Sequence, residues 1–105
     1  MEKNLKMTIE EVRSGDSLQL NIGGKIDAIS APELQNEVLK AFQKSRNVIL
    51  NFSDVSYISS AGLRALLIGQ KTAGSKGGKF LVINCNDSVK DILRVTGLDK
   101  VLTVQ

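Results

Sequence analysis

The chain has 105 residues, 42% of them hydrophobic and 24% charged, which is the balance of a single soluble globular domain, residues 1–105. Its formal charge of +3 comes from basic residues spread along the sequence, and only 4% of the residues are aromatic, so direct nucleic-acid binding is not expected. Because the chain has no histidine and one cysteine, a Ser-His-Asp catalytic site, a Cys/His zinc site and an internal disulfide are excluded.

Hydropathy gives no sign of a membrane protein. No apolar run approaches the roughly 20 residues that span a bilayer. The start of the chain, MEKNLKMTIEE, has no apolar core of a signal peptide. We therefore expect a cytoplasmic protein that does not insert into membranes.

A β-hairpin is predicted at the start of the chain. Residues 7–13 form the first expected strand, and residues 17–22 alternate apolar and polar side chains as a half-buried strand does. Ser14-Gly15-Asp16 is the turn between them, and Gly23-Gly24 is expected to end the second strand.

A helix is predicted next. Ser30 and Glu33 have the spacing of a capping box, and Pro32 falls in the first turn, where a missing N–H costs little. Apolar residues then recur at helical spacing: Leu34, Val38, Ala41 and Phe42.

The middle of the chain predicts a strand, a turn and a second helix. Residues 47–52 form a nearly continuous apolar run, which is typical of a strand buried on both faces. Ser53 and Asp54 indicate a turn. An apolar helical run follows from about residue 61 to residue 73 and is expected to end near Gly74.

A strand, a helix and an edge strand are predicted to close the chain. Residues 80–83 predict a buried strand, a cap at residues 86–88 opens a third helix that stops at Gly97, and residues 101–104 form the edge strand. Cys85 falls at a strand end, where a buried thiol is expected. The order β-β-α-β-α-β-α-β predicts an α/β fold: a mixed sheet opened by an antiparallel hairpin, with helices in the crossovers between parallel strands.

The serine pair before the second helix is the main candidate site. Ser59 and Ser60 lie where a strand gives way to a helix, at the sheet edge where ligands of α/β folds gather. The backbone N–H groups of a helix start carry partial positive charge, so a hydroxyl there caps the helix and a phosphate there is stabilised. Ala61 and Gly62 are small and leave the helix start open to a partner. The residues alone leave a simple cap and a phosphorylation site both open.

Two further features have a functional and a structural interpretation. On the second helix, Arg64, Ile68 and Lys71 fall near one another, and this face is either a partner surface or is covered by neighbouring elements. Asp27 by itself is interpreted as a solvated loop carboxylate. The stretch GSKGGK at residues 74–79 lacks the spacing and the following helix of a phosphate-binding loop, so it is interpreted as a turn.

The combined pattern resembles the anti-sigma-factor antagonists of the bacterial STAS domain family over nearly the whole chain. The motifs are IGGKIDAISAPEL at residues 22–34, VILNFSDVSYISSAGLRALL at residues 48–67 and SVKDILRVTGLDKVL at residues 88–102. The resemblance implies that Ser60 is the phosphorylated serine, with Ser59 as the fallback, and that Asp27 is the acid of the family's first loop. Family members often carry an acid before the phosphorylated serine, and this chain carries Ser59 there.

The resemblance also implies a partner switch without catalytic residues, cofactor or metal. The unmodified protein would bind a serine kinase that is also an anti-sigma factor, phosphorylation would release it, and a PP2C-type phosphatase would reset it. The alternatives are a STAS docking subunit of a lipid or solute transporter without a phospho-switch and, disfavoured by the absence of paired carboxylates, a small phosphate-acting enzyme. The expected partner-binding residues are Asp27, Ser59, Ala61, Gly62, Arg64 and Ile68.

Overall fold

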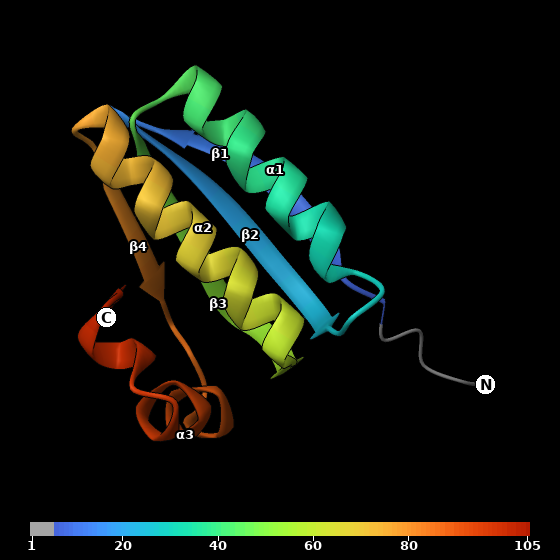
Figure 1. The fold of residues 1–105 in the computed structure, drawn as a ribbon. Coiled ribbons are helices and arrows are strands. Elements are labelled where there is room, and N and C mark those ends of the chain that lie inside the picture. Colours follow the sequence, from blue (N-terminus) through green and yellow to red (C-terminus); the bar gives the residue numbers. More distant parts are fainter. Residues whose placement is uncertain (1–5) are drawn as a thin grey trace.

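Five strands form one mixed sheet with the order β1-β2-β3-β4-β5 in a computed structural model that describes residues 6–105 (Figure 1). The first five residues of the expected domain lie outside the described residues. The α/β class and the antiparallel opening hairpin are confirmed, because β1 pairs antiparallel with β2 and all later pairs are parallel. The strands are β1 (Thr8–Ser14), β2 (Ser17–Ile26), β3 (Asn47–Ile58), β4 (Lys79–Ile83) and β5 (Thr103–Val104).

Helices occupy the crossovers between the parallel strands. In Figure 1 the first two helices lie side by side across the sheet, and the third lies beyond the end of β4. Right-handed crossovers between strands that are neighbours in chain order place successive helices on the same face. The helices are α1 (Ala31–Lys44), α2 (Ser60–Lys76), α3 (Asp87–Val95) and a short 3-10 helix, η1 (Leu98–Lys100).

The core lies between the sheet and the helices, and the other face of the sheet is more open. In β3, Val48, Leu50 and Phe52 are buried, whereas the alternating residues Ile49 and Asn51 are only half-buried. The prediction that residues 47–52 are buried on both faces is therefore wrong. The reason is topological, since sequential right-handed crossovers leave one face without a helix.

α2 approaches the sheet closely through a glycine. A Cβ atom on Gly69 would lie 2.6 Å from Cζ of Phe80 on β4, so only glycine fits there without movement of the ring. The Phe80 ring in turn packs against Phe42 of α1, with 6.0 Å between the ring centroids. The two long helices are thus held over the same aromatic pair.

β2 and β3 are longer than the sequence predicts. Gly23-Gly24 does not end β2, and Ser53 and Asp54 are not a turn but continue β3. The β2–β3 register shifts at two points, and β3 uses one residue more than β2 at each of them. Gly23 also allows β2 to pair closely with β1 on its other side, because a Cβ there would lie 2.8 Å from Oγ1 of Thr8. With these register shifts β3 stays paired with β2 up to Ile58, two residues before α2 begins.

The end of α2 also differs from the prediction. The helix continues past Gly74 and ends at Lys76, with Gly77 as a left-handed cap at φ 67°. The N–H of Gly78 donates to the carbonyl of Ala73 at 2.9 Å, which completes the glycine C-cap. A Cβ on Gly78 would overlap the carbonyl oxygen of Arg46, so the chain must turn at this pair rather than at Gly74.

The third helix begins where the sequence predicts, whereas the edge strand begins later. Asn86 caps α3 by accepting from the N–H of Val89 at 2.8 Å. The predicted edge strand 101–104 is shorter, because the N–H groups of Val101 and Leu102 donate back to the carbonyl of Leu98 in η1, and only Thr103–Val104 pairs with β4. Cys85 is buried, at 7% exposure, as predicted.

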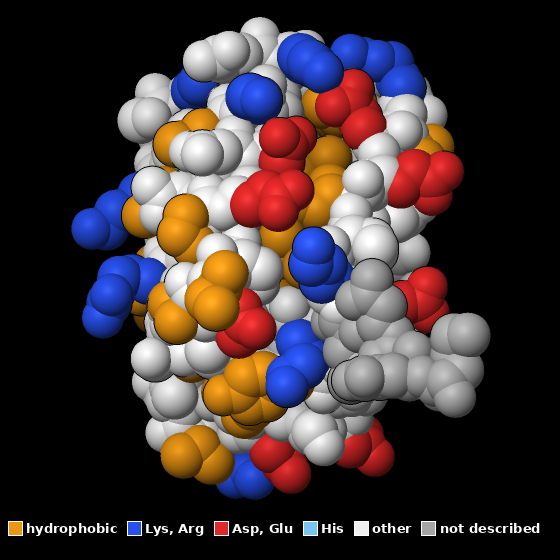
Figure 2. Space-filling view, turned by 90° about the vertical axis from the view of Figure 1, so that its right-hand side faces the viewer, with side chains coloured by type: hydrophobic (Ala, Val, Ile, Leu, Met, Phe, Trp, Pro, Cys, Tyr) orange, Lys and Arg blue, Asp and Glu red, His pale blue; other side chains and the backbone are white. Residues whose placement is uncertain are grey.

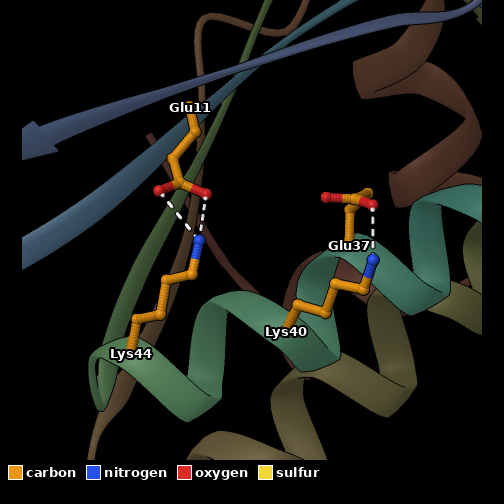
Figure 3. A network of polar contacts seen from close by, with 4 residues as sticks. All are labelled: Glu11, Glu37, Lys40 and Lys44. Carbon is orange, nitrogen blue, oxygen red and sulfur yellow. Dashed lines mark hydrogen bonds and ion pairs between the residues drawn. The ribbon is translucent and has the colours of Figure 1, made fainter.

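One exposed ion pair joins α1 to the edge strand β1, and a second lies within α1 (Figure 3). Nζ of Lys44 lies 3.0 and 3.1 Å from the two carboxylate oxygens of Glu11 on β1. A second pair, between Lys40 and Glu37, lies within α1 at 3.5 Å. Because all four side chains are partly or largely exposed, each pair stabilises the fold by no more than about 1 kcal/mol.

Candidate functional site

Ser59 caps α2 with its side chain. Its backbone is extended, at φ −89° and ψ 173°, and its Oγ accepts a hydrogen bond from the N–H of Gly62 at 3.2 Å. Its carbonyl accepts from the N–H of Leu63 at 2.9 Å. Ser59 is half-buried, and its hydroxyl already serves the helix.

Ser60 is the first residue of α2 and is exposed. Within the part of the chain that the structure describes, its hydroxyl has no hydrogen-bond partner, and the N–H groups of Ser60 and Ala61 have no acceptor. A free hydroxyl therefore lies at the positive end of a helix dipole beside two unused donors. This arrangement suits a group that gains negative charge.

The serine pair is tied to the loop between β2 and α1. The N–H of Ser59 donates to the carbonyl of Ile26 at 2.8 Å, which places Asp27 and the rest of the loop beside the start of α2. A groove of about 220 Å³ lies where the two elements meet, with Ala28 and Pro32 on one side and Ala61 and Arg64 on the other. The predicted grouping of Asp27 with the start of the second helix thus has a structural basis.

Asp27 organises this loop. Its Oδ1 accepts hydrogen bonds from the N–H groups of Ile29 and Ser30, at 3.0 and 2.9 Å, and from the hydroxyl of Ser30 at 3.1 Å. The backbone N–H of Ser30 is the main cause that lowers the pKa of Asp27, followed by the Ser30 hydroxyl, the N–H of Ile29 and the charge of Lys25. The interpretation of Asp27 as a merely solvated loop carboxylate is therefore incomplete.

The predicted capping box of α1 does not form. Ser30 has a helical backbone, at φ −88° and ψ −18°, and makes no side-chain cap bond. Its Oγ instead accepts from the N–H of Asp27 at 3.0 Å and is 3.1 Å from the carbonyl oxygen of Lys25. The hydroxyl of Ser30 thus bonds within the turn that precedes α1 rather than to the first N–H groups of the helix. An N-cap residue needs an extended backbone, which Ser59 has and Ser30 does not.

Gly62 is buried and sets the position of α2. A Cβ there would lie 2.6 Å from Cγ1 of Ile58 and 2.7 Å from Cγ2 of Ile26. Because glycine has no Cβ, the first turn of α2 packs directly on the ends of β2 and β3. Gly62 thus positions the expected partner surface without being exposed in it.

The outer face of α2 is only partly open. Arg64 and Lys71 are exposed, Ile68 and Ala61 are half-buried, and Ala65 is buried. Among residues 6–105, no carboxylate forms an ion pair with Arg64. Arg64 is therefore the most exposed of the expected partner-binding residues, and it lies on the same helix as the exposed Ser60.

Residues 6–105 were compared with the geometry of metal sites and of membrane-spanning helices. Across residues 6–105, no three Asp, Glu or Cys side chains lie close enough together to hold a metal ion. In the same part of the chain, no helix is both long and apolar enough to cross a bilayer.

A comparison with known protein families agrees with the fold. The family model of the STAS domain matches residues 8–105. The chain belongs to the STAS domain family. This STAS domain is 24% identical to the anti-sigma-B factor antagonist of Bacillus subtilis (strain 168) over 100 residues, which cover 95% of this chain and 92% of that protein. The resemblance seen in the sequence motifs is thereby confirmed, and the name of that relative denotes a regulatory binding protein rather than an enzyme.

Solved STAS domain structures have the same fold. An anti-sigma factor antagonist from Mycobacterium paratuberculosis matches with a TM-score of 0.87 at 21% identity, covering 99% of this chain and 89% of that one. The Bacillus cell fate determinant SpoIIAA, in its phosphorylated form, matches with a TM-score of 0.71 at 15% identity, covering 95% and 91%. At these identities the likeness establishes the shared architecture.

Proposed function

We propose that this STAS domain protein is an anti-sigma-factor antagonist controlled by phosphorylation of Ser60. Unmodified, it binds a serine kinase that is also an anti-sigma factor, and the phosphorylated form is released and is reset by a PP2C-type phosphatase. The observation that carries the proposal is the free, exposed hydroxyl of Ser60 at the start of α2. The names of the relatives and the phosphorylated state of SpoIIAA support it.

The neighbouring hydroxyls favour Ser60 over Ser59 as the modified residue. Phosphorylation of Ser59 would put a bulky, charged group on the oxygen that caps the Gly62 N–H at 3.2 Å, and would require a half-buried side chain to turn outward. Ser60 needs no such rearrangement. A kinase that reaches this junction therefore meets one available hydroxyl.

A phosphate at Ser60 acts on the partner rather than on the fold. It adds about −1.5 to −2 charge at neutral pH, which the start of a helix tolerates or favours. In an interface the same charge has to lose water or meet unpaired acids, at a cost of several kcal/mol. A loss of about 3 kcal/mol weakens binding more than a hundredfold.

The proposed partner-binding surface around the serine pair is formed by Asp27, Ala61, Arg64 and Ile68. Gly62 holds α2 in place beneath it. Asp27 fixes the loop on one side, and Arg64 provides an exposed positive charge on the other. Because the proposed kinase uses ATP, and because binding of the unmodified protein to the anti-sigma factor would free a sigma factor for transcription, we infer that the protein acts in the cytoplasm.

Phosphorylation by a candidate serine kinase of the same organism tests the proposal. After incubation with ATP, intact mass and peptide mapping should find one added phosphate, on Ser60. Ser60→Ala should remain unmodified yet bind the kinase, and Ser60→Asp should bind poorly. Ser59→Ala is the matched control and should still be phosphorylated.

The outcome also decides against the main alternative. If no candidate kinase adds phosphate, or if Ser60→Ala is phosphorylated at the normal rate, the proposed switch at Ser60 is wrong. A protein that is never phosphorylated but is captured by a transporter subunit would instead be a docking subunit, with the serine pair as a simple helix start.

A further inference from the structure

Ile29 is the most exposed large hydrophobic side chain among the described residues, at 90% exposure. It follows Asp27 by two positions, in the loop between β2 and α1. Figure 2 shows the side of the molecule that faces right in Figure 1, where exposed hydrophobic side chains lie among charged ones.

The loop holds Ile29 in one position. The N–H of Ile29 donates to Oδ1 of Asp27 at 3.0 Å, and the next residue, Ser30, is held by the same oxygen and by the carbonyl of Lys25. The N–H of Ala31 donates to the carbonyl of Asp27 at 2.9 Å. An apolar side chain on such a turn has lost its backbone freedom before any partner arrives, which lowers the entropic cost of binding.

Ile29 is also continuous with the proposed phosphorylation site. The neighbouring residue Ala28 lines the groove of about 220 Å³ together with Ala61 and Arg64 of α2. Ala61 follows Ser60 directly and Ile29 follows Ala28, so the isoleucine and the serine flank the same groove. The guanidinium of Arg64, which also lines the groove, has no ion-pair partner among residues 6–105.

We propose that Ile29 is the apolar anchor through which this protein binds its kinase, an inference that rests on the proposed function. The kinase presents an apolar socket for Ile29 and, beside it, a carboxylate that pairs with Arg64. Interface energy is concentrated in side chains that become fully buried in a partner pocket. Ile29 contributes binding free energy in both states of the protein, and a phosphate on the nearby Ser60 weakens the complex as a whole.

Binding of Ile29→Ala to the kinase that phosphorylates Ser60 tests the inference. Its affinity should fall about tenfold or more, while its melting temperature stays that of the wild type, because Ile29 contacts little of its own fold. Val95→Ala is the matched control: Val95 is an aliphatic side chain at 76% exposure on α3, and its loss should change affinity less than about twofold. Ile29→Leu should retain most of the binding.

Arg64→Gln tests the second contact. It should slow association with the kinase and reduce the dependence of association on salt, since a rim charge acts mainly on encounter. If Ile29→Ala binds as tightly as the wild type while Ser60 is phosphorylated normally, the anchor is wrong and the proposed function stands. If no kinase binds or phosphorylates the wild type, both are wrong.

Discussion

The hydroxyl of Ser59 accepts the N–H of Gly62 at 3.2 Å, while the hydroxyl of the adjacent Ser60 is unbonded within residues 6–105. Two identical side chains thus have different roles because one precedes the helix on extended backbone and the other is already inside its first turn. Ser59 stabilises the start of α2, and Ser60 is exposed to solvent. This division leads to stability predictions that need no kinase.

Replacing Ser59 by alanine should destabilise the protein, and replacing Ser60 should not. Loss of an N-cap side chain lowers the free energy of unfolding by about 0.5–2 kcal/mol. Ser60→Ala removes an exposed hydroxyl without a partner in the described structure and should stay within about 0.5 kcal/mol of the wild type. Urea denaturation of the two variants measures the difference. Equal effects would show that Ser59 is not the cap in solution.

Gly62→Ala should destabilise the fold by about 1–3 kcal/mol, because the new Cβ would overlap Ile58 and Ile26. Gly74→Ala, in the same helix, is the control. Gly74 has nothing within 4 Å of an added Cβ, so alanine there should stabilise the protein by about 0.4–1 kcal/mol. Denaturation midpoints that move in the same direction would contradict the close approach of α2 to the sheet at Gly62.

Ionised Asp27 should contribute stability that is lost in acid. Its pKa in the folded state lies below the ordinary value of 3.8, chiefly because the N–H of Ser30 binds the ionised form. The contribution is therefore present above pH 3.8 and disappears as the pH falls through the folded-state pKa. Asp27→Asn keeps an oxygen acceptor without the charge, so its melting temperature should fall less steeply than that of the wild type between about pH 5 and pH 2.

Asp16→Asn is the control for this pH series. The Asp16 carboxylate is exposed and has no hydrogen-bond or ion-pair partner among the described residues. Its variant should keep the acid dependence of the wild type. Identical profiles for the wild type and Asp27→Asn would show that the Asp27 turn is not formed in solution.

Cys85 should resist thiol reagents in the native protein. The side chain is 7% exposed, and burial raises the pKa of its thiol, so both access and thiolate content are low. Reaction with an aromatic disulfide at pH 8 should accelerate on unfolding in urea, roughly a hundredfold for an opening free energy of about 3 kcal/mol. A native rate close to the unfolded rate would place the thiol at the surface.

The order of elements could be predicted because hydrophobic periodicity and turn residues mark most of them clearly. The second half of β3 could not, because Ser53 and Asp54 have the composition of a turn and their pairing depends on register shifts against β2. The sequence also does not show which glycine ends α2. Gly74, Gly77 and Gly78 all allow a stop, and the contact of Gly78 with Arg46 selects the last two.

The candidate site was predictable to the level of the serine pair and Asp27. The capping pattern could not separate Ser59 from Ser60, because their roles depend on where β3 ends, and that end was misplaced. The exposure of Ile29 was not visible either. It follows from the Asp27 turn, which the sequence presents only as an acid after two glycines.

Gly62 and Gly69 lie two helical turns apart on the buried side of α2, each against side chains that leave no room for a Cβ. A helix in contact at both points can neither slide along the sheet nor roll over it without a clash. We therefore expect a chemical change at its first residue to have a local effect, without a shift of the helix that would alter the far surfaces of the domain. A protein that responds to such a change would then have to contact the changed residue or its immediate neighbours.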